Sequence, residues 1–300
     1  MRQNTLHENA VLTDRQEYLY IEHAIIEQQD SSVCIIQGSS RTPIPIASIG
    51  CLILGPGTSI THRAIEAMAD SGCLLIWSGE HLRTWYASGA QSDRSSQHIQ
   101  TQARCWADKV SHMKIVRWMY AQRFPDLDMR GLSLEQMRGM EGQRVHDLYQ
   151  KYAEQYHVAW SGRIYRQDDW ESQPLIQQAL TTGCQLLYHV SHAAILLMGY
   201  EPALGFIHTG KCESFVFDLA DLYKADFVIP QAFSGVSLGK DLEHIRYDMR
   251  IGMQQGKILK RMEKDLLAMF ADYETADISG LWDGEEVAKS GLNYRNKMEQ

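Results

Sequence analysis

Short runs of apolar and β-branched residues, separated by Gly, Pro and Ser, fill the first 88 residues of the chain. Runs of this length and composition are typical of β-strands. The turn-forming sequence Gly55-Pro56-Gly57 precedes a short predicted helix, Thr61–Ala69, which Thr58 or Ser59 would cap. We therefore predict a small β-rich domain over residues 1–88, with strands at Glu17–Ile21, Val33–Gln37, Thr42–Ile46, Cys51–Leu54, Cys73–Ile76 and Arg83–Ala87.

From residue 96 the pattern becomes helical. The segment Ser96–Phe124 runs without Gly or Pro, which predicts one long helix that ends before Pro125. Ser133 and Gln136 form the S-x-x-Q pattern of a capping box, which predicts a second helix start. Further helices are predicted at Gln173–Met198, Glu213–Asp226 and Leu242–Phe270.

The small polar residues 89–95 predict a linker between the two regions. The predicted fold class is thus α+β: a small N-terminal β-rich domain (residues 1–88) followed by a larger all-α domain (residues 96–300). The helical domain is predicted to carry the metal site described below and to end in an acidic stretch.

Composition narrows the class of protein. With 44% hydrophobic and 22% charged residues, the chain has the composition of a soluble globular protein. No stretch approaches 18 uncharged apolar residues, and the first residues lack the apolar core of a signal peptide, so we expect a cytoplasmic protein without a membrane segment. The six cysteines form no CxxC pair, which favours reduced core thiols over a zinc or redox centre.

Net charge neither supports nor excludes a nucleic-acid partner. The chain carries a net charge of −8, yet residues 59–170 hold 14 Lys and Arg against 13 Asp and Glu. The acidic excess therefore lies elsewhere, and residues 265–299 alone hold eight acids against three bases. Only local clustering of basic side chains could form a phosphate-binding surface.

The segment Gly205–Asp226, GFIHTGKCESFVFDLADLYKAD, carries the clearest candidate chemistry. His208 lies in a glycine-flanked turn, and Asp218 and Asp221 lie three positions apart in the helix that follows, so both carboxylates project from one face. Mg²⁺ and Mn²⁺ favour carboxylate oxygens, and Mn²⁺ also accepts an imidazole nitrogen. Because the helix is apolar on its other faces, we expect buried carboxylates that need a metal or a basic partner.

Glu141, in the sequence QMRGMEGQRV, is the best candidate for a third carboxylate. Gly139 and Gly142 flank it, and each glycine inside a helix costs about 1 kcal/mol relative to alanine, which suggests close approach by another backbone or a ligand. A solvated glutamate on a slightly kinked helix is the alternative. Likewise, Lys211 or Lys224 could pair with the aspartates in place of a metal.

Other motifs are absent or weaker. The chain contains no Walker A loop, GxGxxG or GxSxG sequence, so P-loop nucleotide hydrolysis, dinucleotide redox chemistry and serine-hydrolase chemistry have no support. His189 and His192 are three positions apart but form no HExxH motif, and we interpret them as chance neighbours on a helix face.

Several blocks, in order along the chain, resemble the CRISPR-associated endonuclease that serves as the integrase of the spacer-acquisition complex. The type I-E (Cascade-type) branch is the most similar. The resemblance runs from about Leu12 to about Gly256, and GFIHTGK followed by SFVFDLADLYKAD is its most specific block. The other blocks are Leu54–Ala64, Trp77–Gly89, Lys114–Phe124, Gln136–Val145 and Gly162–Trp170. The chain departs from the family in its acidic end, where relatives carry a longer Pro-rich tail, and at His112, where a basic residue is expected.

The resemblance implies a β-rich N-terminal domain used for dimerisation and a helical catalytic domain. It implies that Glu141, His208 and Asp221 bind Mg²⁺ or Mn²⁺, with Asp218 as an accessory carboxylate. The implied reaction is the insertion of short foreign DNA into a CRISPR array, by attack of a DNA 3′-hydroxyl on a phosphodiester of the repeat. The implied partners are double-stranded DNA (prespacer and leader–repeat) and a small partner subunit, whose central dimer is flanked by two homodimers of this chain in a heterohexamer.

Basic and aromatic side chains in or beside these blocks are candidate DNA contacts. We expect phosphate contacts from Arg63, Arg83, Arg138, Arg163 and Lys211. We expect base stacking by Tyr165, Trp170 and Tyr188. Solvated surface charge and ordinary packing are the alternative roles for these two groups. Two other functions stay open: a repair nuclease for branched DNA, and a non-catalytic DNA-binding scaffold in which the same residues form a buried ionic network.

Overall fold

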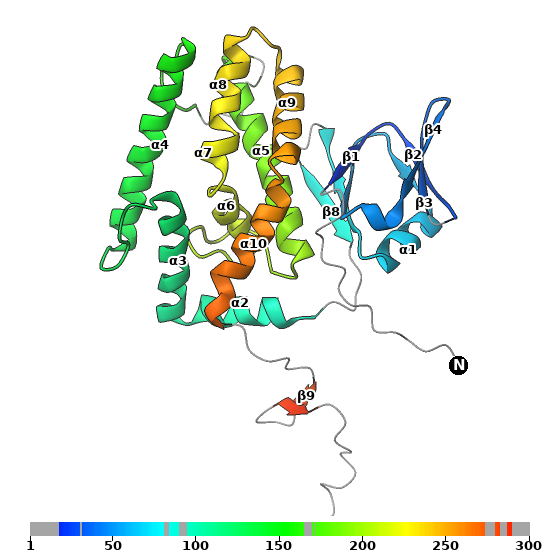
Figure 1. Cartoon of the computed structure of the whole chain (residues 1–300), viewed down its shortest axis with the longest axis horizontal. Helices are drawn as coiled ribbons and strands as arrows, with labels where there is room; N and C mark the ends of the chain where they lie inside the picture. Colours follow the sequence, from blue (N-terminus) through cyan, green and yellow to red (C-terminus); the bar gives the residue numbers. More distant parts are fainter. Residues whose placement is uncertain are drawn as a thin grey trace, which may run out of the picture.

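The computed structural model describes residues 18–30, 32–80, 84–89, 95–164, 170, 172–273, 280–282 and 287–289. Most of its strands gather on one side of the molecule, together with α1 (His62–Asp70), and the other helices lie on the opposite side (Figure 1). The predicted α+β class, with the β-rich region first and the helical region second, is confirmed.

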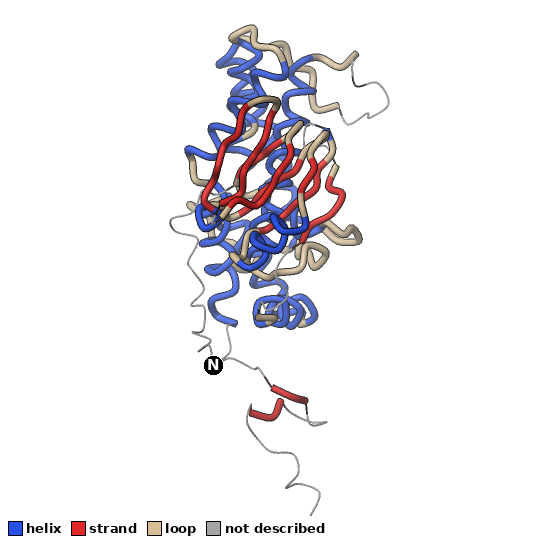
Figure 2. The backbone as a smooth tube through the Cα atoms, turned by 90° about the vertical axis from the view of Figure 1, so that its right-hand side faces the viewer, coloured by secondary structure: helices blue, strands red, loops and turns tan. Residues whose placement is uncertain are grey.

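Within the described residues, the N-terminal region forms two four-stranded sheets. In the first sheet, β1 (Leu19–Ile21), β5 (Cys51–Leu54) and β7 (Leu74–Ser78) run parallel, and β8 (Trp85–Gly89) is antiparallel to β7. The second sheet has the order β4-β3-β2-β6, formed by Ser40–Pro45, Ser32–Gln37, Ile25–Gln29 and Ser59–Ile60. Figure 2 shows the sheets from the strand side of the molecule, with the helices behind them.

The predicted strands are recovered with small shifts, although Glu17 and Arg83 lie outside the described residues. Strand β2 was not predicted, because Ile25–Gln29 ends in three polar residues. Helix α1 (His62–Asp70) was predicted, but its cap is Thr61, whose hydroxyl accepts the Ala64 N–H at 3.3 Å. The prediction of a cap at Thr58 or Ser59 is wrong because the chain first forms β6.

Strands β5 and β7 bury both of their faces. One face packs into the core of the helical region through Cys51, Ile53, Leu74 and Ile76. The other face packs into a second core beside α1 through Leu52, Leu54 and Leu75. Strands buried on both faces read as continuous apolar runs rather than alternating ones, as CLIL and LLIW do here. The first sheet therefore belongs to both cores.

The helical region is built around one apolar helix, α5 (Leu175–Leu197), which is buried along most of its length. The other helices are α2 (Gln97–Ala107), α3 (Lys109–Arg123), α4 (Leu134–Tyr156), α6 (Ser214–Ala220), α7 (Lys224–Phe227), α8 (Ile229–Ser237), α9 (Leu242–Gln255) and α10 (Ile258–Phe270). Helix α5 contacts α6, α8, α9, α10 and strand β7. A helix that is apolar on most faces must be surrounded in this way.

Three predicted helices are interrupted. The predicted helix Ser96–Phe124 is two helices, because the Asp108 carboxylate accepts the Ser111 N–H at 2.8 Å and starts α3 afresh. The predicted helix Leu242–Phe270 breaks after Gly256, where Lys257 adopts a φ of 49°. The predicted helix Glu213–Asp226 becomes α6 and α7 with a turn between them.

The boundary between the two regions falls between Gly89, the end of β8, and Gln97, the start of α2. Residues 90–94 of the predicted linker lie outside the described residues, and the division into two domains stays a prediction. Beyond residue 273 the structure describes an antiparallel pair, β9 (Gly280–Trp282) and β10 (Val287–Lys289). The sequence predicted an all-α second region, whereas the structure adds this short strand pair to its helices.

The described part of the chain holds no helix that is both long and apolar enough to cross a membrane. All six cysteines are free. Five are buried, as predicted, but Cys212 is exposed.

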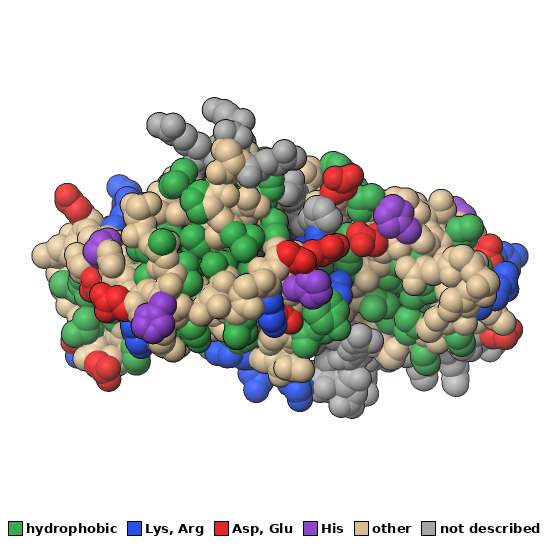
Figure 3. Space-filling view, turned by 90° about the horizontal axis from the view of Figure 1, so that it is seen from above, with side chains coloured by type: hydrophobic (Ala, Val, Ile, Leu, Met, Phe, Trp, Pro, Cys, Tyr) green, Lys and Arg blue, Asp and Glu red, His purple; other side chains and the backbone are tan. Residues whose placement is uncertain are grey.

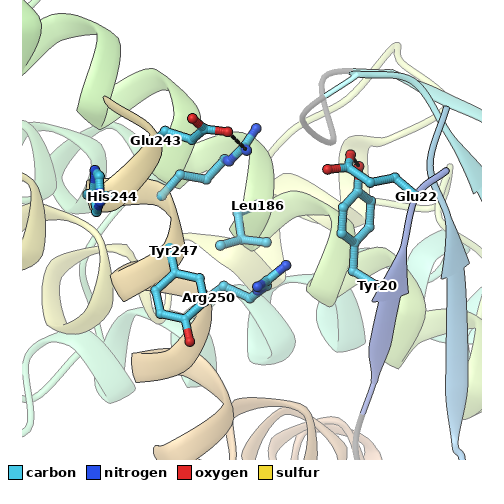
Figure 4. Close-up of a pocket in the computed structure, with 8 residues that line it drawn as sticks. Tyr20, Glu22, Leu186, Glu243, His244, Tyr247 and Arg250 are labelled. Carbon is cyan, nitrogen blue, oxygen red and sulfur yellow. Dashed lines mark hydrogen bonds and ion pairs between the residues drawn. The ribbon is translucent and has the colours of Figure 1, made fainter. Parts of the chain in front are cut away.

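A groove of about 330 Å³ lies between β1 and α9. Tyr20 and Glu22 line its strand side, and Tyr247 and Arg250 lie across from them on α9 (Figure 4). Arg246, on the same helix, pairs with Glu243 at 3.5 Å. Seen from above, charged and histidine side chains gather near the border between the helical and strand regions (Figure 3). The lining of the groove combines Arg246 and Arg250 with the aromatic side chains of Tyr20 and Tyr247.

An aromatic cluster joins β8 to α5. The Trp85 ring stacks on His192, with centroids 3.7 Å apart and planes 10° apart, and His189 approaches the same ring at 5.7 Å. The two histidines thus share a packing role that their spacing did not predict. Burial lowers the pKa of His192 to about 4, and the neighbouring His189 adds to the shift.

This lowered pKa predicts acid sensitivity of the packing between the sheet and α5. His192 is neutral in the folded protein down to pH about 4 but takes up a proton near pH 6.5 when unfolded, so stability is lost as pH falls between these values. His192→Phe keeps the stacked ring but cannot titrate. We expect it to reduce the slope of unfolding free energy against pH by about 1.4 kcal/mol per pH unit in this range. Urea unfolding from pH 7 to pH 4.5 measures the slope, and parallel curves would contradict the expectation.

Candidate active site

The turn that carries His208 is fixed by hydrogen bonds to both its backbone carbonyl groups and its backbone amides. Three consecutive carbonyl groups, those of residues 205–207, accept hydrogen bonds from side chains of α2, α3 and α4: Trp106 (3.1 Å), His112 (2.8 Å) and Arg138 (3.0 Å). Three consecutive amides, those of residues 206–208, donate to the Asp218 carboxylate at 2.5, 3.0 and 2.9 Å. The conformation of the turn is therefore fixed by four other elements.

Asp218 lies in α6 and its side chain is fully buried. Besides the three amides, its carboxylate accepts a hydrogen bond from His208 Nδ1 at 2.7 Å. A carboxylate that accepts from Nδ1 fixes the proton there, which leaves the Nε2 lone pair of a neutral imidazole free. His208 Nε2 lies 4.0 Å from Asp221 Oδ2. Asp218 thus orients His208, and its own oxygens are already occupied.

The same contacts change the pKa of His208. The hydrogen bond to Asp218 raises this pKa, burial opposes the rise, and the charges of Asp218 and Asp221 add to it. The net shift is upward from the usual value. In the protein without a bound cation, His208 therefore keeps its second proton to a higher pH than a free histidine does.

Asp221 ends α6, three positions after Asp218. The structure brings Asp218 and Asp221 to opposite ring nitrogens of His208, at 2.7 Å from Nδ1 and 4.0 Å from Nε2.

Glu141 lies in the third turn of α4, which begins with the predicted capping box between Ser133 and Gln136. Its Oε1 lies 3.4 Å from Arg144 Nη1, whereas its Oε2 is buried and has no hydrogen-bond partner among the described residues. Burial raises the pKa of Glu141, the nearby Asp221 charge raises it further, and nearby cations oppose the shift. The carboxylates of Glu141 and Asp221 therefore repel each other when both are ionised.

The glycines beside Glu141 have a different role from the one predicted. A Cβ atom added at Gly139 or Gly142 would have no neighbour within 4 Å. The expectation of a closely approaching backbone is therefore wrong. Both positions border open space, which keeps this side of α4 free around Glu141.

Cations lie close to the carboxylates: Arg123 is buried, and Arg144 and Lys224 are half-buried. Arg123, only 6% exposed at the end of α3, donates from Nη2 to the Asp218 carbonyl oxygen at 3.4 Å. Burial lowers the pKa of Lys224, but Cys184 and Asp221 lead a larger opposing effect, so the net shift is upward and the side chain stays charged. Lys224 was considered from sequence, whereas Arg123 and Arg144 were missed. The i,i+3 spacing of Arg144 from Glu141 is the one signal that could have found it.

The residues present fit a divalent cation in donor chemistry. Glu141 and Asp221 supply carboxylate oxygens, one of them without a partner, and His208 supplies a free Nε2 lone pair. In the described structure, however, no three His, Cys, Asp or Glu side chains converge tightly enough to hold a metal ion as they stand. Metal ligation by Glu141, His208 and Asp221 stays a prediction.

Two of the candidate DNA contacts lie beside His208. The ring of Phe217 is the common neighbour: Tyr188 meets its edge at 5.0 Å, His208 at 5.8 Å, and the ammonium group of Lys211 lies 5.8 Å from its centroid. Tyr188 is half-buried and Lys211 is exposed. The structure thus places Tyr188 and Lys211 at the candidate active site.

The other candidates are dispersed. Arg138 is exposed and holds the His208 turn, whereas Arg163 donates to Gln177 and Thr181 of α5, each at 2.7 Å. Arg63 is exposed on α1, at the other end of the molecule from α4 (Figure 1). Trp170 is half-buried, and Arg83 and Tyr165 lie outside the described residues. Their DNA contacts stay predictions. Arg246 and Arg250, which line the groove beside β1, had no sequence signal.

Comparisons with known proteins now add to this geometry. No protein-family model matches the chain. Over 294 residues the chain is 40% identical to CRISPR-associated endonuclease Cas1 2 of Thermus thermophilus, covering 94% of this chain and 90% of that protein. It is 41% identical over 223 residues to CRISPR-associated endonuclease Cas1 of Escherichia coli, covering 74% and 73%. The crystal structure of a TtCas1–DNA complex matches with a TM-score of 0.70 and 42% identity, over 84% of this chain and 95% of that one.

The chain has a β-rich region followed by a helical bundle, and a buried aspartate orients the histidine of its candidate site. Its fold is that of a CRISPR-associated nuclease. The chain belongs to the CRISPR-associated endonuclease Cas1 family. The resemblance seen in the sequence blocks is confirmed at the level of the family.

Removing the negative charge of Asp218 tests its role in orienting His208. In Asp218→Asn we expect the pKa of His208 to fall, because the hydrogen bond to Asp218 is the largest cause of its rise. We also expect a loss of about 3 kcal/mol in unfolding free energy, since buried donors lose their acceptor. NMR titration of the His208 ring and urea unfolding measure the two effects. Asp241→Asn, which breaks the exposed pair with His244, is the matched control, and an unmoved His208 titration in Asp218→Asn would contradict the assignment.

Two glycines give opposite expectations for the same substitution. A Cβ at Gly205 would lie 2.4 Å from the His208 carbonyl oxygen and 2.7 Å from Ser214, so Gly205→Ala should displace the turn and cost about 2 kcal/mol. Gly139→Ala meets open space inside a helix and should stabilise by about 0.5–1 kcal/mol. Thermal unfolding of both variants distinguishes them, and equal shifts would refute the packing at Gly205.

Proposed function

We propose that this chain is a divalent-metal-dependent DNA endonuclease and integrase, which inserts short foreign DNA into a CRISPR array. The observation that carries the proposal is the fixed pair of Asp218 and His208, which leaves Nε2 facing Asp221. The charge of Asp221 in turn acts on Glu141, whose Oε2 is buried without a partner among the described residues. The sequence blocks that resemble the type I-E branch lead us to propose that branch for this chain. Because the proposed substrate is array DNA, we propose that the protein acts in the cytoplasm.

Glu141, His208 and Asp221 would hold Mg²⁺ or Mn²⁺. Such a cation polarises the scissile phosphate and stabilises charge on the displaced oxygen. Asp218 keeps the His208 proton on Nδ1, so that Nε2 stays available as a ligand. Arg144 and Lys224 balance the carboxylate charges in the absence of a cation. The attacking group is a DNA 3′-hydroxyl in integration and water in simple cleavage.

Cations at two places support the proposed DNA binding: beside His208, and in the groove between β1 and α9. Lys211 beside His208 and the α9 arginines in the groove are placed to hold phosphates. Arg63, Arg83, Arg138 and Arg163 remain proposed phosphate contacts, and Tyr165, Trp170 and Tyr188 remain proposed stacking surfaces. The solved TtCas1–DNA complex supports DNA binding by this chain. We further propose a homodimer, two of which flank a dimer of the small partner subunit.

The scaffold alternative has one specific observation in its favour. The Arg144–Glu141 ion pair and the half-buried Lys224, whose pKa is raised, supply positive charge beside the carboxylates without a metal. A branched-DNA repair nuclease would use the same site on another substrate. Binding of a cation separates the scaffold from both enzymes, because a scaffold requires none.

The test joins metal binding to strand transfer. Mn²⁺ at about 100 times its Kd should stabilise the folded protein by about 2.7 kcal/mol, seen as a higher melting temperature. Glu141→Gln, His208→Asn and Asp221→Asn should each abolish this rise and reduce half-site integration of a labelled prespacer at least about 100-fold. The assay uses a plasmid that carries the cognate repeat, with the partner subunit present. Asp248→Asn, an exposed carboxylate paired with Lys240, is the control.

The outcomes separate the candidate functions. Integration that persists in all three variants would show that the metal site is misassigned. Metal binding with cleavage of branched DNA but without strand transfer would favour the repair nuclease. A wild-type protein that binds DNA, shows no rise in melting temperature with Mn²⁺ and transfers no strand would favour the scaffold.

A further inference from the structure

The short segment that joins α6 to α7 carries Asp221. Asp221 follows the last residue of α6, and Lys224 begins α7. The amides of Leu222 and Tyr223 donate to carbonyl groups three positions back, at 3.2 and 3.0 Å. Hydrogen bonds of this spacing have poorer geometry than those of an α-helix. The segment is therefore held less firmly by its own backbone than a regular helix is.

Tyr223 connects this segment to α10. Its side chain is only 2% exposed, and its hydroxyl donates to Asp265 Oδ2 at 2.5 Å. Burial raises the pKa of Tyr223, and the hydrogen bond to Asp265 adds to the rise, so the hydroxyl keeps the proton that it donates. The two residues are 42 positions apart, so this contact depends on the packing of α10 beside the segment.

Arg261, one helical turn before Asp265 on α10, contacts the same tyrosine. Its guanidinium carbon lies 5.6 Å from the centroid of the Tyr223 ring and 5.2 Å from that of Phe227. A guanidinium over an aromatic face within about 6 Å is attracted by the ring. Because residues four apart on a helix lie side by side, Arg261 and Asp265 together contact the ring and the hydroxyl of Tyr223. Tyr223, Arg261 and Asp265 thus form a cluster, here called the α10 clamp.

The α10 clamp acts on the part of the chain that presents Asp221 and Lys224. Asp221 Oδ2 lies 4.0 Å from His208 Nε2, and the charge of Asp221 contributes to the raised pKa of Lys224. His208 is fixed separately, by its hydrogen bond to Asp218. A rotation of the segment between α6 and α7 would therefore move Asp221 and Lys224 while His208 stays in place.

We propose that the hydrogen bond between Tyr223 and Asp265 positions Asp221 toward His208, so that both can bind one divalent cation. Tyr223 and Asp265 are positioning residues, because they act through Asp221 rather than on the cation. This inference rests on the metal site of the proposed function. It makes the affinity for the cation depend on α10, a helix that supplies none of the proposed ligands.

The test separates positioning from a general contribution to stability. Tyr223→Phe removes the hydroxyl and keeps the ring. Asp265→Ala removes the acceptor, whereas Asp265→Asn removes the charge but keeps an oxygen that accepts the hydroxyl. Tyr18→Phe is the matched control, because Tyr18 is also buried and its hydroxyl donates to the Arg250 carbonyl oxygen at 3.2 Å.

Calorimetric titration with Mn²⁺ measures the affinity of the folded full-length protein, and amide hydrogen exchange without cation measures opening of residues 221–224. We expect Tyr223→Phe and Asp265→Ala each to weaken Mn²⁺ binding about tenfold and to speed this exchange. The double variant should be no weaker than either single one, because both remove the same hydrogen bond. Asp265→Asn should retain most of the affinity. Tyr18→Phe should lower stability in urea but change neither the Mn²⁺ affinity nor the exchange of residues 221–224.

Two results would overturn the inference: unchanged Mn²⁺ affinity in Tyr223→Phe and Asp265→Ala, or an equal loss of affinity in Tyr18→Phe. Its failure is distinguishable from failure of the proposed function. Metal-dependent strand transfer with unchanged Mn²⁺ affinity in the variants would overturn the positioning role alone. Mn²⁺ binding that depends on Tyr223 and Asp265, in a protein that transfers no strand, would overturn the integrase alone. A wild-type protein that binds no Mn²⁺ would overturn both.

Discussion

The buried carboxylate of Asp218 is the interaction on which the site depends. An ionised carboxylate without solvent must be compensated by donors, and Asp218 obtains four from a single turn: three backbone amides and His208 Nδ1. One side chain therefore sets both the shape of the turn and the direction of its imidazole. Because the same group does both, the position of His208 cannot vary independently of the backbone that carries it.

The opposite side of the turn is held by the bundle itself. Side chains of α2, α3 and α4 restrict the conformation of this loop, because Trp106, His112 and Arg138 each donate a hydrogen bond to one of its carbonyl groups. Glu141 lies on α4, the helix that supplies Arg138. The relative positions of Glu141 and His208 therefore depend on helix packing and on this loop contact together, although the two residues are far apart in sequence.

Local signals in the sequence predicted much of this. The capping box at Ser133 and the i,i+3 spacing of Asp218 and Asp221 act over one helical turn, so pattern alone found them. Pattern could not find the break at Asp108, because an acidic residue within a polar helix face looks the same whether it is solvated or caps a new helix. Nor could it find Arg123 or the stacking of Trp85 on His192, since these contacts arise from packing between distant elements. Metal ligation is an expectation from resemblance and from the donor chemistry of Glu141, His208 and Asp221.

The two-faced sheet of β5 and β7 has a consequence for modularity. Its strands contribute to the helical core through one set of alternate residues and to the N-terminal core through the other. Rotating the N-terminal region as a rigid body relative to the helices would remove Cys51, Ile53, Leu74 and Ile76 from the apolar core that they share with the helices. Exchange of this region between relatives would therefore have to preserve the surface of α5 that packs against β7.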